Sequence, residues 1–391
     1  MNIPVENCSS CGACANICAR GAISMQLDGE GFYRPVLEAN KCVQCGACER
    51  VCPWTNIVSN PNESSDVPQT FAAYAKDESI RMESSSGGIF TVLAEKILND
   101  GGVVVGVAQL SPTKFGHIVV DNKADLGKLR GSKYVQADTG MIYREVRSLL
   151  KTGKKVLFSG TPCQVAALYA VLGRAATSAD LTTVDIVCHG APSVNVFEKY
   201  VRELEKNQGA SFETIIFRDK CTGWSSYSLL HRFAGEISLL VHSSRSKYMH
   251  LFLSRICQNQ SCDDCLYRKL PRIADITLGD YWNVSKYHPE MNDNKGISVV
   301  LLNTTPGKEL FEFVADKVIQ CESKVEYSIA CNPCIVRSSM PNLKRTDFFA
   351  NLDKYSLDEL IKKYCPYPSL VKSLYFRARD VLKRIKRKIV R

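Results

Sequence analysis

The sequence lacks any long hydrophobic run. Its longest apolar stretches are residues 101–110 (GGVVVGVAQL) and 296–302 (GISVVLL), far shorter than the ~20 residues that a transmembrane helix needs. The chain also reaches Cys8 without the basic start and apolar core of a secretory signal peptide. Both absences predict a cytoplasmic protein.

The main part of the chain also lacks a large excess of charge of either sign. The formal net charge is +10, but residues 367–391 hold nine lysines and arginines against one acid, Asp380, and so account for +8 of it. A nearly neutral remainder does not predict the basic groove of a nucleic-acid-binding protein. We therefore expect no nucleic acid among the partners.

The basic end of the chain has helical periodicity. Apolar side chains recur among basic ones at Leu370, Leu374, Ala378, Leu382, Ile385 and Ile389. A basic amphipathic helix is typical of a segment that lies on a membrane surface or binds a partner. A terminal helix packed on the body would show the same pattern. Peripheral attachment at the inner membrane face is thus one of two hypotheses for this segment.

Cysteine, in contrast, is abundant, with 18 in the chain. In a reducing compartment, clustered cysteines are metal ligands or redox groups more often than disulfides. Two runs stand out, because residues 8–18 read CSSCGACANIC and residues 42–52 read CVQCGACERVC. Both follow the pattern C-x2-C-x2-C-x3-C.

This spacing is that of bacterial two-cluster ferredoxins, in which three cysteines of a run wrap one 4Fe-4S cluster and the fourth reaches the other. The rule assigns Cys8, Cys11, Cys14 and Cys52 to one cluster, and Cys42, Cys45, Cys48 and Cys18 to the second. Gly12 and Gly46 are predicted to form the tight turns around them. Two zinc knots are the alternative, but zinc sites combine two CxxC pairs and do not repeat this four-cysteine rhythm.

The remaining composition divides the chain into four parts. Between the two runs, an apolar segment, an Asp-Gly-Glu-Gly turn and a second apolar segment predict a hairpin, so residues 1–56 are expected to form a small α+β ferredoxin-type domain. Residues 57–69 are polar and without periodicity, which indicates a linker. A larger domain over 70–350 and a basic helical segment over 351–391 follow.

The larger domain alternates helical and strand patterns. We expect helices near 88–99, 139–151, 164–173 and 193–207, and strands at 103–109, 155–158 and 182–187. This alternation predicts an α/β domain with a largely parallel central sheet. Beyond residue 211, the segments FETIIFRD, SYSLLHRF and EISLLVH predict added antiparallel strands, followed by a helix at 246–257.

Serine and glycine gather in three segments of this domain, SSSGG (84–88), RGSKYVQAD (130–138) and SGTPC (159–163). The first and third precede predicted helices, whose N-termini favour anions such as phosphate, although for SSSGG taken alone a plain capped helix start is the commoner explanation. The usual dinucleotide fingerprint G-x-G-x-x-G is absent after the first strand. Lys133 is a candidate for contact with a phosphate or a flavin edge, or a solvated lysine. Asp275 and Asp280 are polar candidates that are more often structural than catalytic.

Four scattered cysteines also form a pattern. Cys163 and Cys188 each follow a predicted strand, and parallel strands would bring both to the same sheet edge. Cys262 and Cys265 form a C-x2-C pair. Convergence of the four thiolates would hold a third cluster, or zinc. Alternatively, Cys163 is a nucleophile at a helix N-terminus with His189 as its base, or the thiols are simply buried.

In combination, the motifs resemble those of the coenzyme F420 hydrogenase/dehydrogenase beta-subunit family. The matching segments are SSGGIFT, GSKYVQ, FSGTPCQVAAL, DIVCHGAPS, FRDK followed by GW, and the C-x2-C that precedes RIADITLGDYW. The resemblance extends over nearly all of residues 1–350, with the ferredoxin-type runs in front.

The resemblance implies an α/β domain that binds FAD, one 4Fe-4S cluster in this domain and two more in the ferredoxin-type part. Carried over by motif, the ligands of the body cluster are Cys163, Cys188, Cys262 and Cys265. The flavin is expected against Ser85, Ser86, Gly87, Gly88, Ser132, Lys133, Tyr134, Ser159, Gly160 and Thr161. Relatives usually have other residues where this chain has Cys331 and Cys334, so this second C-x2-C is left out.

The implied activity is that of an iron-sulfur flavoprotein oxidoreductase. FAD would exchange a hydride with a small carrier of deazaflavin or nicotinamide type, and the clusters would connect it to a donor or acceptor protein or to a second substrate. The resemblance identifies no catalytic residue. The family is functionally broad, so an electron-transfer subunit without a substrate of its own, serving a partner enzyme such as one of surface-polysaccharide synthesis, is the alternative.

Overall fold

The computed structural model describes residues 5–65, 67–338 and 340–367. Its N-terminal part contains the helices α1 (Ala13–Ile17) and α2 (Ala47–Arg50) and the strands β1 (Ile23–Leu27) and β2 (Tyr33–Leu37). The antiparallel pairing of β1 with β2 confirms the hairpin predicted between the cysteine runs. Gly12 and Gly46 precede the two helices with φ of 73° and 68°, the left-handed conformation that favours glycine in a tight turn.

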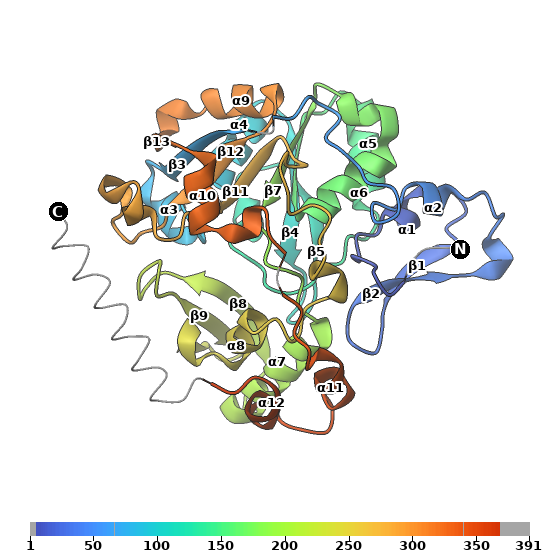
Figure 1. The fold of residues 1–391 in the computed structure, drawn as a ribbon, viewed down its shortest axis with the longest axis vertical. Coiled ribbons are helices and arrows are strands. Elements are labelled where there is room, and N and C mark those ends of the chain that lie inside the picture. The colour runs from blue at the N-terminus through green and yellow to red at the C-terminus, as the bar shows by residue number, and fades with distance from the viewer. Residues whose placement is uncertain (1–4, 66, 339, 368–391) are drawn as a thin grey trace.

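The larger domain is built around one eight-stranded sheet (Figure 1). Its strands are β3 (Gln69–Ala75), β4 (Val103–Gln109), β5 (Phe115–Val120), β6 (Val156–Gly160), β7 (Leu181–Ile186), β11 (Ile276–Asp280), β12 (Ser298–Leu302) and β13 (Val318–Ser323), in the order β13-β3-β12-β11-β7-β6-β4-β5. The adjacent strands β11, β7, β6 and β4 are parallel, as the alternation predicts. The outer pairings are antiparallel, so the prediction of a largely parallel sheet is wrong for both sides.

The connections explain the antiparallel sides. Residues 110–114 join β4 to β5, and so short a connection can form only an antiparallel hairpin. Residues 281–297 join β11 to β12 through the 3-10 turns η6 (Val284–Lys286) and η7 (Pro289–Met291), without a helix that crosses the sheet. We call residues 281–297 the β11–β12 connection.

Helices cover both faces of the sheet (Figure 1). On one face, α4 (Ile89–Asn99) and α9 (Thr305–Glu312) pack on an apolar layer from the sheet, and α3 (Glu78–Glu83) precedes α4. On the other face lie α5 (Ile142–Lys151), α6 (Pro162–Leu172) and α10 (Val325–Cys331). The helices predicted near 88–99, 139–151 and 164–173 are thereby confirmed, with ends that differ by at most three residues.

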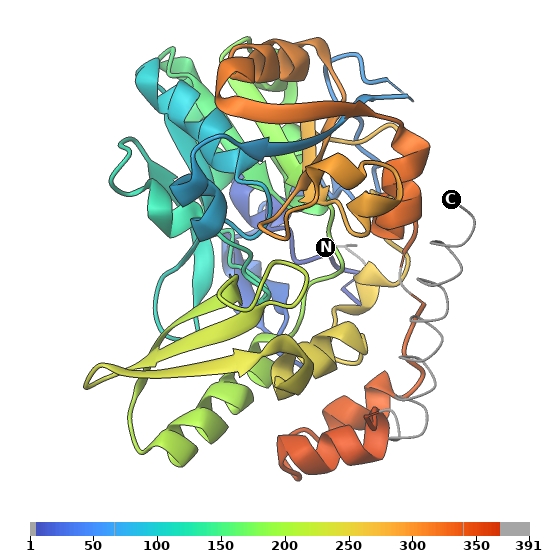
Figure 2. The ribbon, with the colours of Figure 1, turned by 90° about the vertical axis from the view of Figure 1, so that its left-hand side faces the viewer.

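A second lobe lies at the edge of the large sheet (Figure 2). It holds a separate antiparallel sheet of β8 (Phe212–Asp219), β9 (Ser228–Phe233) and β10 (Ile237–His242), with the helices α7 (Val194–Gln208), α8 (Lys247–Leu253), α11 (Arg345–Ala350) and α12 (Leu357–Tyr364). Its core is rich in aromatic side chains, among them Phe197, Phe212 and Tyr248. The strand-rich region predicted beyond residue 211 is confirmed, but it forms its own sheet.

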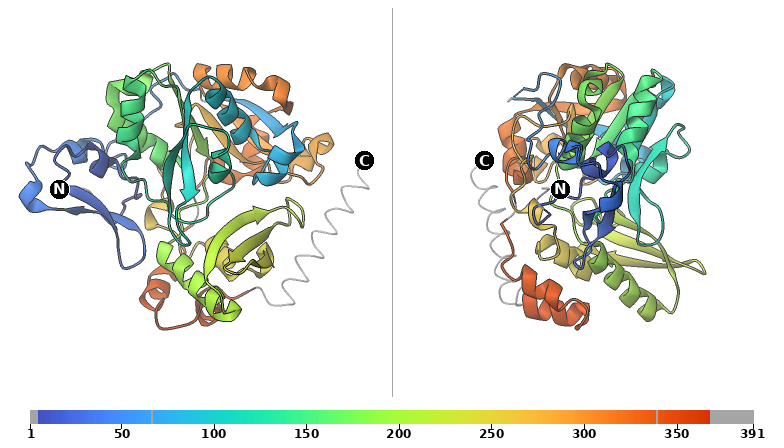
Figure 3. Two further views of the ribbon diagram at one scale, coloured as in Figure 1. Left: turned by 180° about the vertical axis from the view of Figure 1, so that it is seen from behind. Right: turned by 90° about the vertical axis from the view of Figure 1, so that its right-hand side faces the viewer.

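The ferredoxin-type part is docked on the body beside α5 and α6 (Figure 3). The Asn16 side-chain amide donates to the Gly140 carbonyl at 2.8 Å, and the Tyr143 hydroxyl donates to the Cys11 carbonyl at 2.8 Å. At Gly12, a side-chain Cβ would lie 2.1 Å from the Thr139 Oγ1 atom. The two parts therefore approach at a point where only glycine fits.

The segment 57–69 also contacts the body, although its composition predicts a linker. The Asn62 amide donates to the Asp275 carboxylate at 3.1 Å, and the Ser65 amide donates to the Asn303 carbonyl at 3.0 Å. These bonds hold the segment along the edge of the large domain.

The predicted basic helix at 367–391 lies outside the described residues, apart from its first position. Within the part of the chain that the structure describes, no helix is both long and apolar enough to cross a bilayer.

A buried ion pair joins β7 to the segment before β11. Arg272 donates from Nη2 to the Asp185 carboxylate at 2.8 Å, and both side chains have no exposed surface. The same guanidinium donates to the carbonyls of Tyr267 and Ile335, each at 3.1 Å. Burial raises the pKa of Asp185, and the charge of Arg272 opposes that rise. Such a pair is costly to break, because the remaining partner stays buried and unpaired.

We expect Arg272→Met to destabilise the fold by about 3–5 kcal/mol, because the Asp185 carboxylate loses its counter-charge. The measurement is the urea midpoint of anaerobically purified protein. The double variant Arg272→Met/Asp185→Leu should recover much of the loss, since no buried charge remains. Lys96→Met, which breaks an exposed pair with Asp100, is the control and should scarcely move the midpoint. Equal losses in Arg272→Met and Lys96→Met would contradict the interpretation.

Candidate functional site

The structure groups the N-terminal cysteines across the two runs. Burial, followed by the neighbouring Cys8 thiol and more weakly by Cys52, raises the pKa of Cys11 to about 12. Burial and, more weakly, Cys18 likewise raise the pKa of Cys48. Such influences act over short distances. Cys52 therefore lies with the first run and Cys18 with Cys48 of the second, in the crossed arrangement that the spacing predicts.

The two runs repeat one backbone conformation at their first cysteine. Ser10 and Gln44, each two positions after that cysteine, have φ of 59° and 53°. Their N–H groups donate to the sulfur atoms of Cys8 and Cys42, both at 3.4 Å. In the first run, the Ala22 N–H group also donates to the Cys18 sulfur at 3.2 Å. Hydrogen bonds to sulfur favour the thiolate form that a cluster ligand requires.

The four body cysteines come together at the carboxyl edge of the parallel strands. Cys163 lies in the first turn of α6 after β6, and Cys188 follows β7. Burial raises the pKa of Cys163, followed by the nearby Cys265 and Cys188. Burial also raises that of Cys262 to about 12, with Cys188 and Cys265 adding to it. The structure thus places all four thiols close together.

Backbone amides point at this set as well. The Gly190 N–H group donates to the Cys188 sulfur and the Ala191 N–H group to the Cys262 sulfur, both at 3.4 Å. The Thr161 hydroxyl lies 3.2 Å from the Cys163 sulfur. The loop after β7 therefore orients two of the thiols and supplies donors for their charged forms.

In the structure, none of the three cysteine sets is drawn together tightly enough to hold a single zinc ion. Around one zinc ion, four thiolates at about 2.3 Å from the metal would lie about 3.8 Å apart. Among the described residues, only one set of three potential ligands has its donor atoms within 4.8 Å of one another, and it contains none of these cysteines. A larger core with several metal ions is what sulfur atoms at wider spacing accommodate.

The geometry also disfavours Cys163 as a nucleophile. An activated thiol has a lowered pKa, whereas burial and two neighbouring thiols raise that of Cys163. The imidazole of His189, the candidate base, lies 3.4 Å from the sulfur of a different cysteine, Cys334. Cys331 lies in an apolar cluster with a sulfur contact of 3.9 Å to the Asn283 carbonyl.

Two tyrosines lie between the ferredoxin-type part and the body cysteines. Burial raises the pKa of Tyr143, and Cys11 and Cys163 contribute to that rise. Tyr267 is influenced by the same two thiols and donates to the Pro53 carbonyl at 2.8 Å. Cys11 also acts on the body set directly, since its charge contributes weakly to the raised pKa of Cys163. The first cysteine set is therefore adjacent to the body set.

A cavity of about 520 Å³ opens beside the body cysteines. This volume is in the range of small-molecule and cofactor sites. Cys163 and Cys188 line the cavity. All three predicted loops contribute to it, through Ser85, Ser86, Gly88, Ser132, Lys133, Tyr134, Ser159, Gly160 and Thr161. The cavity therefore combines the predicted flavin loops with two of the predicted cluster ligands.

Gly87 is the one predicted loop residue that does not line the cavity. A Cβ at this position would lie 2.4 Å from the Ala73 carbonyl oxygen and 2.9 Å from the Ser298 nitrogen. The glycine therefore lets the loop pack closely against β3 and β12. Gly87 therefore positions the SSSGG loop and does not itself face the cavity.

The two helix N-termini at the cavity differ. No side chain caps α4 at Gly88, and Ile89 and Phe90 of its first turn line the cavity. In α6, Thr161 and Gln164 form a capping box that satisfies the first amide groups. An 11-residue helix with uncapped N–H groups attracts an anion, so α4 is the better place for a phosphate.

Two arginines on the cavity wall have unpaired donors. Arg130 and Arg218 both line the cavity, and their Nε atoms are buried without a hydrogen-bond partner among the described residues. Buried donors of this kind are rare unless a ligand satisfies them. Arg130 forms an ion pair with Glu83 through its Nη1 atom. An anionic cofactor therefore fits the polar groups that the cavity presents.

Lys133 lies on the cavity wall but turns its ammonium group away. Its Nζ atom donates to the carbonyls of Arg130 at 2.6 Å and Lys128 at 3.0 Å. The residue is half-buried, and burial lowers the pKa of its ammonium group to about 7. In this conformation it holds the 128–133 turn together.

The two aspartates named from the sequence have different surroundings. Asp275 is buried away from the cavity, where it accepts from the Thr183 N–H group at 2.8 Å and the Thr304 hydroxyl at 2.7 Å. Asp280 lines the cavity and pairs with Arg218 at 2.9 Å. Asp275 is thus structural, as expected, whereas Asp280 belongs to the site.

Sequence reasoning missed a cationic and aromatic corner of the cavity. The Arg218 guanidinium lies 4.1 Å from the Tyr227 ring centre and 4.9 Å from that of Trp282. The Trp282 ring stacks on Trp224 at 5.0 Å, and all of these except Trp224 line the cavity. Arg218 lies in the segment FRDK and Trp282 in the segment GDYW. The two segments come from different lobes, so their contact is visible only in the folded structure.

Known families match three parts of the chain. Residues 70–142 and 153–326 match the N-terminal and C-terminal parts of the coenzyme F420 hydrogenase/dehydrogenase beta subunit, and residues 7–56 match a 4Fe-4S dicluster domain. Among solved structures, a chain of the F420-reducing NiFe hydrogenase complex from Methanosarcina barkeri is similar, at 19% identity and a TM-score of 0.46, over 78% of this chain and 95% of that chain. No curated protein gives a match.

The two beta-subunit matches describe consecutive parts of one family and together span most of the larger domain. The dicluster match spans both cysteine runs and supports iron-sulfur clusters in the N-terminal part. The chain therefore belongs to the coenzyme F420 hydrogenase/dehydrogenase beta-subunit family, an oxidoreductase family, and carries a 4Fe-4S dicluster domain in front of the family domain.

Proposed function

We propose that the chain is an electron-transferring iron-sulfur flavoprotein that binds FAD in the 520 Å³ cavity and 4Fe-4S clusters at three cysteine sets. The observation that carries this proposal is the position of Cys163 and Cys188, which line the same cavity as the three serine- and glycine-rich loops. When bound, a flavin would take up a hydride and release its electrons singly to clusters.

The order of the cysteine sets supports a relay through the chain. The cavity borders the body set at Cys163, which is adjacent to Cys11 of the first N-terminal set. The second N-terminal set is more exposed, with Cys45 at the surface. This set is therefore the part where a partner protein would exchange electrons.

The cavity supports a small hydride carrier as the second ligand. It extends from the α4 N-terminus to the corner of Arg218, Tyr227 and Trp282. Aromatic faces and a guanidinium suit a planar ring such as that of a deazaflavin or a nicotinamide. Arg218 is held by Asp280, so its charge is fixed in position before a ligand arrives.

The first test measures cofactors on anaerobically purified protein. We expect about one FAD per chain on denaturation and about twelve irons, four for each cysteine set. The visible flavin band should bleach on addition of a reduced deazaflavin or nicotinamide. Clusters without flavin would contradict the proposal and favour an electron-transfer subunit that has no substrate of its own.

The second test concerns Arg130. Arg130→Met removes the unpaired Nε donor from the cavity wall, and hydrogen bonds to charged groups are worth about 1.5–3 kcal/mol. We therefore expect FAD to bind about 10–100-fold more weakly, as measured by titration of flavin-depleted protein, with iron unchanged.

Glu83→Gln is the matched control for this change. It breaks the ion pair between Arg130 and Glu83 but keeps the guanidinium at the cavity. Flavin affinity close to that of the unchanged protein is expected. If Glu83→Gln weakened flavin binding as much as Arg130→Met, the effect would come from the loop and not from a contact with the cofactor.

The third test separates cluster ligands from nearby thiols. Cys163→Ser is expected to lower the iron content by about four per chain, because it removes a ligand of the body cluster. Cys334→Ser is the control, since this thiol lies beside His189 and close to Cys188 but outside the proposed set. It should keep all of its iron. If Cys334→Ser lost iron and Cys163→Ser kept it, Cys334 and not Cys163 would be the cluster ligand.

A further inference from the structure

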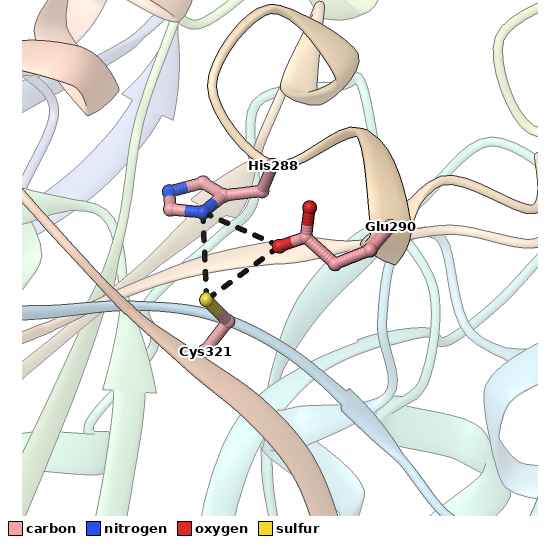
Figure 4. Close-up of side chains that lie close together, drawn as sticks. All are labelled: His288, Glu290 and Cys321. Carbon is pink, nitrogen blue, oxygen red and sulfur yellow. Dashed lines mark hydrogen bonds and ion pairs between the residues drawn. The ribbon is translucent and has the colours of Figure 1, made fainter.

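A group of potential metal ligands lies apart from the twelve cysteines discussed above. His288 and Glu290 come from the β11–β12 connection, and Cys321 comes from the edge strand β13 (Figure 4). The His288 Nδ1 atom lies 3.4 Å from the Cys321 sulfur and 3.7 Å from the Glu290 Oε1 atom. The third side of the triangle, from sulfur to Oε1, is 3.8 Å.

These distances match the edges of a tetrahedral zinc site. With bonds of about 2.3 Å to sulfur and about 2.0–2.1 Å to nitrogen and oxygen, the edges would be about 3.6 Å to sulfur and about 3.3 Å between nitrogen and oxygen. The observed triangle differs from these values by at most 0.4 Å. We propose that His288, Glu290 and Cys321 bind one zinc ion, with water as the fourth ligand.

The surroundings of His288 prepare it for this role. Its Nε2 atom lies 2.8 Å from the Ser323 hydroxyl, which in turn lies 2.7 Å from the Tyr281 hydroxyl. A hydrogen bond at Nε2 leaves Nδ1 free to bind a metal and fixes the ring, as in many zinc sites. The His288 side chain is buried, whereas Glu290 is exposed, so the site is closed on one side and accessible on the other.

The donor set selects the metal. A thiolate and an imidazole together favour zinc over magnesium or calcium, which prefer oxygen ligands. One carboxylate and one open position complete a four-coordinate site. The site contains one cysteine only, which distinguishes it from the all-cysteine sets.

The proposed ion would tie the β11–β12 connection to the edge of the sheet. The same connection supplies the carbonyls of Lys295 and Gly296, which accept hydrogen bonds from Lys220 at 2.7 Å and Arg81 at 2.9 Å. Lys220 also donates to the Ser86 carbonyl at 2.6 Å, and Ser86 lines the cavity. The ion would therefore support the cavity wall from outside.

The experiment uses full-length, cluster-loaded protein that is purified anaerobically, incubated with zinc and desalted. We expect one zinc per chain at unchanged iron, with X-ray absorption showing one sulfur and three nitrogen or oxygen neighbours. Zinc that had replaced a cluster would show four sulfur neighbours and a loss of iron, and would overturn the proposal. A zinc content near zero would do the same.

Variants locate the site. Glu290→Gln changes an exposed side chain, so it should fold normally, and both it and Cys321→Ser should weaken zinc binding at least 100-fold. Ser323→Ala should weaken it about 10–100-fold, because it removes the partner of His288. Glu322→Gln and Cys221→Ser, which change an exposed acid beside the site and an exposed thiol elsewhere, should bind zinc normally.

Two results would overturn the assignment. One is zinc binding by Cys321→Ser and Glu290→Gln that equals that of the unchanged protein. The other is equal weakening in Cys221→Ser, which would show that zinc binds exposed thiols in general. If Cys321 only donates a hydrogen bond to His288 and no metal binds there, the measured zinc content would be near zero.

Discussion

Parallel pairing of β6 with β7 is the constraint on which the candidate site depends. Because the two strands run in the same direction, the segments after Gly160 and Ile186 leave the sheet at one edge. Cys163 and Cys188 are thereby neighbours, although 24 residues separate them in the sequence. The third strand, β11, runs parallel to β7 and brings Asp280 to the same edge. The cavity, two of the proposed cluster ligands and the Arg218 pair all follow from this one arrangement.

A second constraint is that charged side chains must be buried together with the groups that pair with their charge. The proposed clusters and flavin would need thiolates and cations in a buried region, and unpaired charges there are costly. Nearby backbone donors are present, since the N–H groups of Gly190 and Ala191 donate to the sulfur atoms of Cys188 and Cys262. Arg272 lies fully buried but paired with Asp185. On the cavity wall, the Nε atoms of Arg130 and Arg218 and the Thr91 hydroxyl are buried without a hydrogen-bond partner among the described residues, which is where a ligand would complete the set.

Much of this site could be predicted from the sequence, because its strongest signals are local. The ferredoxin-type runs repeat over a few residues, and the strand-loop-helix order around Cys163 fixes its position at a sheet edge. The antiparallel sides of the sheet were not predictable from alternation, since the β11–β12 connection contains no crossing helix to mark it. The corner formed by Arg218 and Trp282 joins two lobes, and no periodicity records such a contact. The proposed zinc ligands stand at positions 288, 290 and 321, and their spacing in the sequence matches no motif.

The β11–β12 connection links these observations. At Gly296, with φ of 110°, a Cβ would lie 2.4 Å from the Ser86 carbonyl oxygen, so the connection and the SSSGG loop meet where only glycine fits. The Lys220 ammonium group donates hydrogen bonds to the carbonyls of Ser86 at 2.6 Å and Lys295 at 2.7 Å, and so links the loop to the connection. The position of the loop therefore depends on a connection that has no regular helix or strand of its own. Anchoring this connection to the sheet edge at His288 and Glu290 would restrict the part of the cavity wall that the SSSGG loop forms.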